Sequence, residues 1–166
     1  MKKHLLISLC LLFSLFIYLF YRTEDTVVNN IFLSLISFDF FVELRNNIKN
    51  ALPLNEYIIY SLPEGLWVFC ITLTSRFLFF KIGKHEISLL YLPLVFAIGL
   101  ELFQLFHFSN GYFDFWDIGA SILFWAIAAY LMPFVNKRQN ILNPLNLNSL
   151  ICIISYLIVY LAHVWK

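Results

Sequence analysis

Four carboxylates lie inside or beside apolar stretches of this sequence, where charged residues are otherwise rare: Glu64, Glu101, Asp114 and Asp117. An aspartate at the centre of a membrane helix costs about 2.5–3.5 kcal/mol on insertion scales, so such residues commonly serve binding, proton transfer or catalysis. Two carboxylates held close together can also act as general acid and general base. We therefore take these four positions as the core of the candidate site.

Other polar residues accompany these acids at helical spacing. The first set, spaced three residues apart, is Glu101, Gln104 and His107. The second set, at spacings of three and four residues, is Asp114, Asp117 and Ser121. Residues three or four apart share one face of a helix, and the short link 108–112 favours antiparallel neighbours. We expect the two polar faces to lie opposite each other.

Each acid also has an ordinary structural interpretation. An aspartate at the start of a helix caps free backbone N–H groups, and either Asp114 or Asp117 could be that cap. Glu64 follows Pro63, and proline at the first helical position with glutamate next predicts that a helix starts there. For Glu101 the alternative is a protonated or hydrogen-bonded carboxyl that holds two helices together. Both interpretations stay open for all four acids.

The sequence predicts neither a metal site nor a cofactor site. His107 lies near the acids, and one imidazole with carboxylates can hold a divalent metal, but no second histidine stands at ligand spacing. Trp67, one turn after Glu64, could line a cavity, although packing in the core is favoured. The cysteines stand singly in apolar runs, without zinc or redox spacing, at Cys10, Cys70 and Cys152.

The composition indicates which elements must position these residues. Of the 166 residues, 61% are hydrophobic and only 13% are charged, with a net charge of +1 and a mean hydropathy of +0.81. Soluble domains usually carry about 25% charged residues. We therefore expect an integral membrane protein with a single domain, 1–166, whose surrounding partner is the lipid bilayer. So small a net charge excludes a general nucleic-acid surface.

Five apolar stretches approach the length of about 20 helical residues that crosses a hydrocarbon core. Backbone groups in lipid must be bonded within the segment, so the predicted fold is an all-α integral membrane helical bundle. The stretches are 5–21, 57–80, 87–106, 115–135 and 147–165. The first resembles a signal peptide but lacks a small-residue cleavage site, so an uncleaved anchor is favoured over a cleaved signal. Segment 31–42 is too short to span and predicts one interfacial or re-entrant helix, followed by a polar turn at 45–50.

Basic residues beside these stretches set the expected orientation. One side of the membrane holds Lys2, Lys3, Lys81, Lys84, Lys137 and Arg138, with Arg76 nearby. The other side holds Arg22, Arg45, Lys49 and Lys166. Cytoplasmic loops are richer in Lys and Arg, so the N-terminus is expected in the cytoplasm and the C-terminus outside. All four acids then approach the outer face.

The order of these motifs resembles that of the VanZ-like family of small multi-pass bacterial membrane proteins. The shared pattern is Glu101-x-x-Gln104, a short loop, Asp114-x-x-Asp117 and then a helix rich in small residues. The similarity extends over 57–131, near half of the chain. The resemblance therefore implies a VanZ-like core within the helical bundle.

The sequence departs from the VanZ-like pattern at two positions, so it resembles a divergent member of that family. Many members carry arginine three residues before the first aspartate and asparagine four residues after the second. Gly111 and Ser121 occupy these positions here, so the acids are expected to lack a charged partner. The similarity also places the run 62–67, Leu-Pro-Glu-Gly-Leu-Trp, at the equivalent helix start.

The resemblance implies a protein of the bacterial cytoplasmic membrane, and the founding member is associated with low-level resistance to glycopeptide antibiotics. We expect the outward acidic site to bind a polar or cationic ligand, such as a cell-wall precursor or a glycopeptide-like antibiotic. The alternatives are a structural or assembly partner without a small ligand, an intramembrane acid–base enzyme, and a small transporter. The chain lacks the internal repeat that carriers show, and it carries no signal for an oligomeric state.

Overall fold

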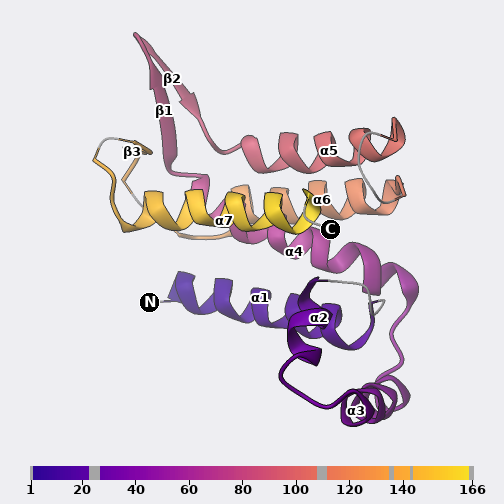
Figure 1. The fold of residues 1–166 in the computed structure, drawn as a ribbon. Coiled ribbons are helices and arrows are strands. Elements are labelled where there is room, and N and C mark those ends of the chain that lie inside the picture. Colours follow the sequence, from indigo (N-terminus) through magenta and orange to yellow (C-terminus); the bar gives the residue numbers. More distant parts are fainter. Residues whose placement is uncertain (1, 23–26, 108–111, 135–136, 143, 165–166) are drawn as a thin grey trace.

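Helices make up most of the protein (Figure 1). The computed structural model describes residues 2–22, 27–107, 112–134, 137–142 and 144–164, without the side chains of residues 2, 27, 28 and 158–164. The helices are α1 (Lys2–Phe20), α2 (Val27–Leu33), α3 (Phe38–Ala51), α4 (Glu56–Ser75), α5 (Leu92–Leu105), α6 (Phe115–Ala126), its π-helical continuation η1 (Ile127–Leu131) and α7 (Leu147–Val164). The strands are β1 (Leu78–Ile82), β2 (His85–Ser88) and β3 (Gln139–Asn140).

Helices α1, α4, α5, α6 and α7 run in alternating directions along one axis (Figure 1). The strands lie at the end where α1 and α7 begin, which we call the sheet end. The other end, where α1 finishes and α6 begins, is the acid end. Helix α4 contacts α1, α5, α6 and α7, and every residue from Pro63 to Ser75 is buried. A helix that is mostly apolar suits this central position.

Two clusters of buried side chains cover opposite sides of α4. One is built on Trp67, Val68, Ile71 and Ala97, and the other on Phe69, Cys70, Leu73 and Ala128. Gly65 allows α4 and α6 to approach, because a Cβ placed on it would lie 2.4 Å from Cδ2 of Phe124. Any side chain at this position would displace the aromatic ring or separate the two helices.

The apolar helices match the five predicted spans in number but not in length. Two of the described helices have the length and hydropathy of a membrane span, Lys3–Phe20 and Glu56–Ser75. Two apolar helices are shorter, Leu92–Leu105 and Phe115–Leu131, and α7 is apolar over its described side chains, Leu147–Leu157. The 14 residues of α5 extend about 21 Å, which is less than a hydrocarbon core of about 30 Å.

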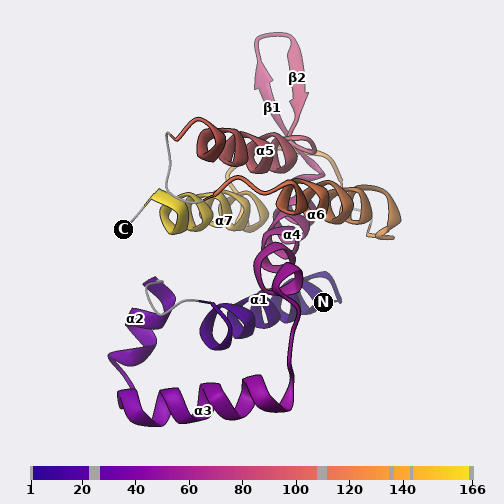
Figure 2. The ribbon, with the colours of Figure 1, turned by 90° about the vertical axis from the view of Figure 1, so that its right-hand side faces the viewer.

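A β-hairpin replaces helix between the second and third predicted spans. The prediction of helix over 57–80 and again from 87 is wrong there, because α4 ends at Ser75 and β1 pairs with β2 in antiparallel register. The two-residue turn begins with Gly83, whose φ of 60° suits hairpin turns. Phenylalanine and isoleucine also favour strands. The hairpin stands clear of the helices (Figures 1 and 2).

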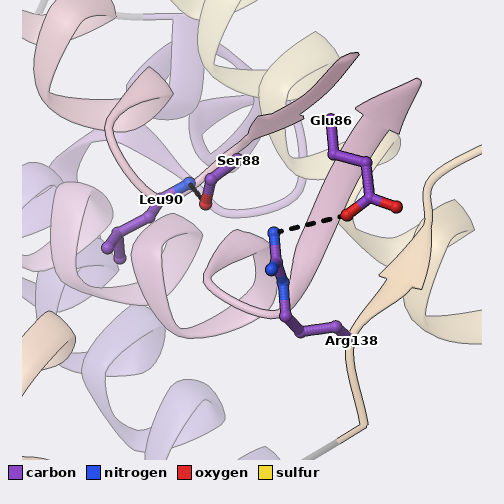
Figure 3. A network of polar contacts seen from close by, with 4 residues as sticks. All are labelled: Glu86, Ser88, Leu90 and Arg138. Carbon is purple, nitrogen blue, oxygen red and sulfur yellow. Dashed lines mark hydrogen bonds and ion pairs between the residues drawn. The ribbon is translucent and has the colours of Figure 1, made fainter. Parts of the chain in front are cut away.

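Strand β3 joins this hairpin in parallel to β1, giving the order β2-β1-β3. In Figure 3, Nη2 of Arg138 lies 4.0 Å from Oε2 of Glu86, and the N–H of Leu90 donates to Oγ of Ser88 at 3.3 Å. The charged side chains are 60% and 47% exposed, so the ion pair contributes little stability. Backbone hydrogen bonds therefore hold the small sheet together.

Prolines set the ends of the two shorter helices that carry acids. Pro93 lies in the first turn of α5, so the helix begins there and not at 87. The continuation of α6 ends at Leu131, short of the predicted 135, because Pro133 disfavours a helical conformation at Met132. Met132 is extended, with φ of −81° and ψ of 121°.

Arg76 stabilises the end of η1 from the neighbouring helix α4. Its Nη1 donates to the carbonyls of Ala128 at 2.7 Å and Met132 at 3.0 Å, and its Nη2 donates to the carbonyl of Phe134. The last carbonyls of a helix lack intrahelical donors and carry partial negative charge, which a guanidinium complements. A residue expected beside the membrane thus serves as a C-terminal cap for another helix.

The turn predicted at 45–50 is wrong, and so are the bounds of the single helix predicted over 31–42. Helix α2 ends inside the first segment, and α3 continues through the second, where a turn was expected. Arg45 accounts for this difference, because its Nε donates to the carbonyl of Phe20 at 3.1 Å and its Nη2 donates to the carbonyl of Arg22. Polar residues that resemble a solvated turn therefore belong to a helix that caps the end of α1.

Candidate functional site

The acid end of the bundle gathers all four carboxylates, and Asp114 caps α6 there while three others lie around it. Glu64 comes from the first half of α4, Glu101 from near the end of α5, and Asp117 from the first turn of α6. Each is close enough to feel the charge of another, since Glu64 interacts with Asp117 and Glu101 interacts with both. We call these three side chains the acid cluster.

Glu64 lies inside α4, so the prediction that a helix starts at Pro63 is wrong. The helix begins seven residues before Pro63, at Glu56, close to the start of the predicted stretch 57–80, and the side chain of Asn55 caps the N–H of Tyr57 at 3.1 Å. Pro63 is accommodated in the interior, where it leaves one carbonyl of the preceding turn without its helical donor. The carboxylate is 7% exposed and does not cap the helix.

Trp67 orients the Glu64 carboxylate. Its Nε1–H donates to Oε2 of Glu64 at 2.7 Å, one turn along the same helix. The indole is buried, and its ring packs edge-on against Phe96 with centroids 6.3 Å apart. Trp67 is therefore a core residue with one polar contact to the site.

Glu101 connects two helices. Its side chain is 4% exposed, and Oε2 accepts a hydrogen bond at 3.1 Å from the backbone N–H of Asp114. Asp114 precedes α6, so the Glu101 carboxylate lies at the positive end of that helix. This contact supports the interpretation of Glu101 as a carboxyl that holds helices together.

Asp114 and Asp117 have different roles, which the sequence left open. Asp114 is the cap of α6, with extended φ and ψ and a hydrogen bond at 2.9 Å from the N–H of Trp116. The capping interpretation is thus confirmed for Asp114. Asp117 lies in the first turn of α6, and its Oδ1 is buried without a well-formed hydrogen bond among the described residues.

Ser61, which the sequence analysis did not select, lies opposite Asp117. It comes from α4, is 6% exposed, and its Oγ is also buried without a hydrogen-bond partner in the described part of the chain. The hydroxyl is near enough to influence the Asp117 carboxylate. Ser61 precedes Glu64 by three residues, a helical spacing that could have linked the two side chains within the predicted stretch 57–80.

Arg22 supplies the positive charge that the sequence analysis expected to be missing. Its Nη2 donates to the carbonyl of Tyr60 at 2.6 Å, and its guanidinium lies 4.5 Å above the ring of Tyr18. It interacts electrostatically with Glu64 and with Asp117. Arg22 follows the first apolar stretch, far from the acids in sequence, so no spacing linked it to them.

Three remaining candidates lie at the margin of the site. Helix α5 ends at Leu105, so the prediction that it carries His107 on the face of Glu101 is wrong. His107 is exposed with φ of 59° and donates its N–H to the carbonyl of Gln104 at 3.0 Å, which closes the helix end. The side chain of Gln104 is half-buried, and Ser121 is buried in α6. Gly111 lies outside the described residues.

The cluster is suited to bind a cation. Arg22 interacts with two of the three carboxylates, Glu64 and Asp117. Ionisation of all three therefore leaves an excess of negative charge that burial makes unfavourable without a compensating cation or proton. Within the described ranges no three His, Cys, Asp or Glu side chains are arranged to hold a metal ion. An organic cation that donates hydrogen bonds would satisfy both the charge and the free oxygens.

Comparison with known proteins does not identify a relative. No family model, curated protein or solved structure matches this chain. The VanZ-like resemblance therefore rests on the sequence motifs, and the functional argument rests on the geometry of the acid cluster.

Proposed function

We propose that this chain is a VanZ-like multi-pass protein of the bacterial cytoplasmic membrane whose acid cluster faces outward and binds a cationic group of a cell-envelope ligand. The ligand class is a cell-wall precursor or a glycopeptide-like antibiotic that carries an amine. The observation that supports it best is the polar pair Asp117 and Ser61, whose Oδ1 and Oγ are buried beside Glu64 and Glu101 without a well-formed hydrogen bond in the described part of the chain. The two side chains are near enough to interact with each other, and a ligand donor between them would complete the hydrogen bonds that buried polar atoms nearly always make.

The exposed surface supports a membrane location. Helix α1 presents large apolar side chains to its surroundings, with Leu5 63%, Leu9 56% and Leu12 61% exposed. Exposed apolar patches of this extent are unfavourable in water and suit lipid. The alternating direction of the five helices places the acid cluster at the end opposite the basic hairpin, which is outside if the N-terminus is cytoplasmic.

An ammonium group matches the cluster better than a neutral ligand does. It carries three N–H donors and one positive charge, while Asp117 offers an acceptor and Ser61 offers either a donor or an acceptor. The guanidinium of Arg22 already bonds the carbonyl of Tyr60 and stacks on aromatic rings, so one cation is in place. A ligand cation would balance a second carboxylate.

The test is complementation of a deletion strain under a glycopeptide antibiotic, with protein abundance measured in parallel. Asp117→Asn is expected to fail to complement the deletion, since the amide removes the charge that the ligand needs. The matched control is Asp114→Asn, because asparagine caps helices as well as aspartate does. It should complement fully. Full complementation by Asp117→Asn at normal abundance would refute the binding proposal.

A structural or assembly role is the second candidate, favoured by two hydrogen bonds. Glu101 bonds the N–H of Asp114, and Glu64 accepts from Trp67, so each acid already supports helix packing. If the role is structural, complementation of the deletion depends only on how much of the protein accumulates. Glu64→Gln and Asp117→Asn should then both complement whenever the protein accumulates, and failure to complement at normal abundance excludes this role.

A further inference from the structure

A small polar cavity lies at the sheet end, away from the acid cluster. Its volume is about 20 Å³, enough for one water-sized group. The polar part of its lining comes from Lys3, Thr74, Lys137, Gln139 and Asn148. These residues belong to α1, α4, the segment around β3, and the first turn of α7.

Positive charge concentrates around this cavity. Among the described residues, Lys3 and Lys137 line it without any aspartate or glutamate, and Arg76 is near enough to repel Lys3 electrostatically. Helices α1 and α7 both begin at this end, so the positive ends of their dipoles add to the field. Lys3 is half-buried, so the repulsion is only partly screened by solvent. A bound anion would reduce the repulsion between these positive charges.

One wall of the cavity is held in place before any ligand arrives. Gln139 and Asn146 exchange two side-chain hydrogen bonds, with Nε2 of Gln139 donating at 3.1 Å and Nδ2 of Asn146 donating at 2.8 Å. Oδ1 of Asn146 also accepts from the N–H of Ser149 at 3.0 Å, which caps the start of α7. The position of α7 relative to β3 is thereby fixed.

We propose that this cavity binds the phosphate of an anionic membrane phospholipid, with Lys3 and Lys137 donating to its oxygens. The proposal rests on the membrane location argued above. A volume of about 20 Å³ admits one phosphate oxygen, and the rest of the headgroup stays outside. The exposed leucines of α1 begin at Leu5, two residues after Lys3, and offer an apolar surface for the acyl chains. That surface favours a lipid over free phosphate.

The test follows thermal unfolding of the full-length protein, purified in a neutral detergent, as single compounds are added. Phosphatidylglycerol is expected to raise the unfolding temperature at low concentration, whereas phosphatidylcholine with the same acyl chains is not. Inorganic phosphate should have little effect. Equal stabilisation by phosphatidylcholine, or by inorganic phosphate alone, would overturn the proposal.

Variants locate the effect. The double variant K3Q/K137Q is expected to weaken the apparent affinity for phosphatidylglycerol about tenfold or more, because two positive charges are lost. The control K81Q/K84Q removes the same charge from the exposed hairpin and should keep the shift. The double variant K3R/K137R retains both charges and should keep the rise in unfolding temperature. It therefore tests the proposal even if K3Q/K137Q folds poorly. An equal loss in both glutamine pairs would refute binding at this cavity.

Two failures are distinguishable in the same preparation. Recovery of the protein from the soluble cell fraction would contradict the membrane location and, with it, this inference. Recovery from the membrane fraction with no preference for anionic lipid would contradict this inference alone. Asp117→Asn, at the other end of the bundle, should leave the response to phosphatidylglycerol unchanged.

Discussion

Glu101 accepts a hydrogen bond at 3.1 Å from the backbone N–H of Asp114, whose own carboxylate accepts one at 2.9 Å from the N–H of Trp116. The two bonds form a chain from the end of α5 into the first turn of α6. They bridge the segment 108–111, which lies outside the described residues. Because Asp117 follows directly after this chain, its position opposite α4 depends on Glu101.

The first prediction concerns Glu101. Glu101→Gln should unfold near the wild-type temperature, because the amide oxygen can still accept from Asp114. Glu101→Leu should lower the free energy of unfolding by about 1–3 kcal/mol, since the Asp114 N–H loses its partner in a buried place. Thermal unfolding of both purified variants in detergent checks this. Equal stability of the two would show that the hydrogen bond is absent or unimportant.

Gly65 provides a test of the contact between α4 and α6. Gly65→Ala should destabilise the protein by about 1–3 kcal/mol, because its Cβ would overlap the ring of Phe124. Gly99→Ala is the matched control, since its Cβ would meet nothing within 4 Å in a helix interior. That change should be neutral or stabilise by up to about 1 kcal/mol. Adding Phe124→Leu should partly rescue Gly65→Ala, and a harmless Gly65→Ala would place the two helices farther apart.

Arg76 should matter far more than its position near a predicted membrane edge suggests. Arg76→Met removes the donors to the carbonyls of Ala128 and Met132, and we expect a loss of about 1.5–3 kcal/mol. Arg138→Met is the control, because its exposed pair with Glu86 is worth about 0–1 kcal/mol. Unfolding in a graded denaturing detergent measures both. Similar losses would mean that Arg76 does not cap the helix.

The packing of α1 on α4 can be tested with the native cysteines. The thiols of Cys10 and Cys70 lie within hydrogen-bonding reach of each other, while Cys152 belongs to α7. Mild oxidation with copper phenanthroline should join Cys10 to Cys70 and leave Cys152 free. After denaturation, an alkylating reagent should modify one thiol per chain, at Cys152. Three reactive thiols would contradict the contact.

Orientation is tested by single cysteines in a variant whose native cysteines are replaced by serine. Asn46→Cys in α3 and Lys84→Cys in the hairpin are both exposed and lie at opposite ends of the bundle (Figure 1). In intact cells a membrane-impermeant thiol reagent should label the first and not the second. The reverse pattern would place the acid cluster on the cytoplasmic side.

Local signals in the sequence were sufficient for several features. Helices α1 and α7 nearly coincide with the apolar stretches 5–21 and 147–165, because these leucine-rich runs contain no proline or glycine to interrupt a helix. Asp114 was a candidate cap from its place before a helix, and it is the cap. Which aspartate of the pair would cap could not be decided, because both have the right residue type within one turn.

Other features depend on contacts between distant residues. Phe-rich residues 78–82 have a hydropathy that suits a membrane helix, and only pairing with β2 and β3 makes them a strand. Residues 45–50 resemble a turn until Arg45 meets the open end of α1. In each case a residue far along the chain supplies the hydrogen-bond partner of the backbone groups, and nearby sequence alone does not predict that partner.

The acid cluster likewise combines residues that the sequence predicted with residues that only the tertiary structure identified. The residue types and their helical spacing determined, by sequence alone, that Glu64, Glu101 and Asp117 would be unusual in an apolar chain. The tertiary structure decided that Arg22 and Ser61 join them, because α1 and α4 pack side by side at that end. Hydropathy and capping act over a few residues, whereas the register of one helix against another is set by side-chain packing such as that of Gly65 with Phe124.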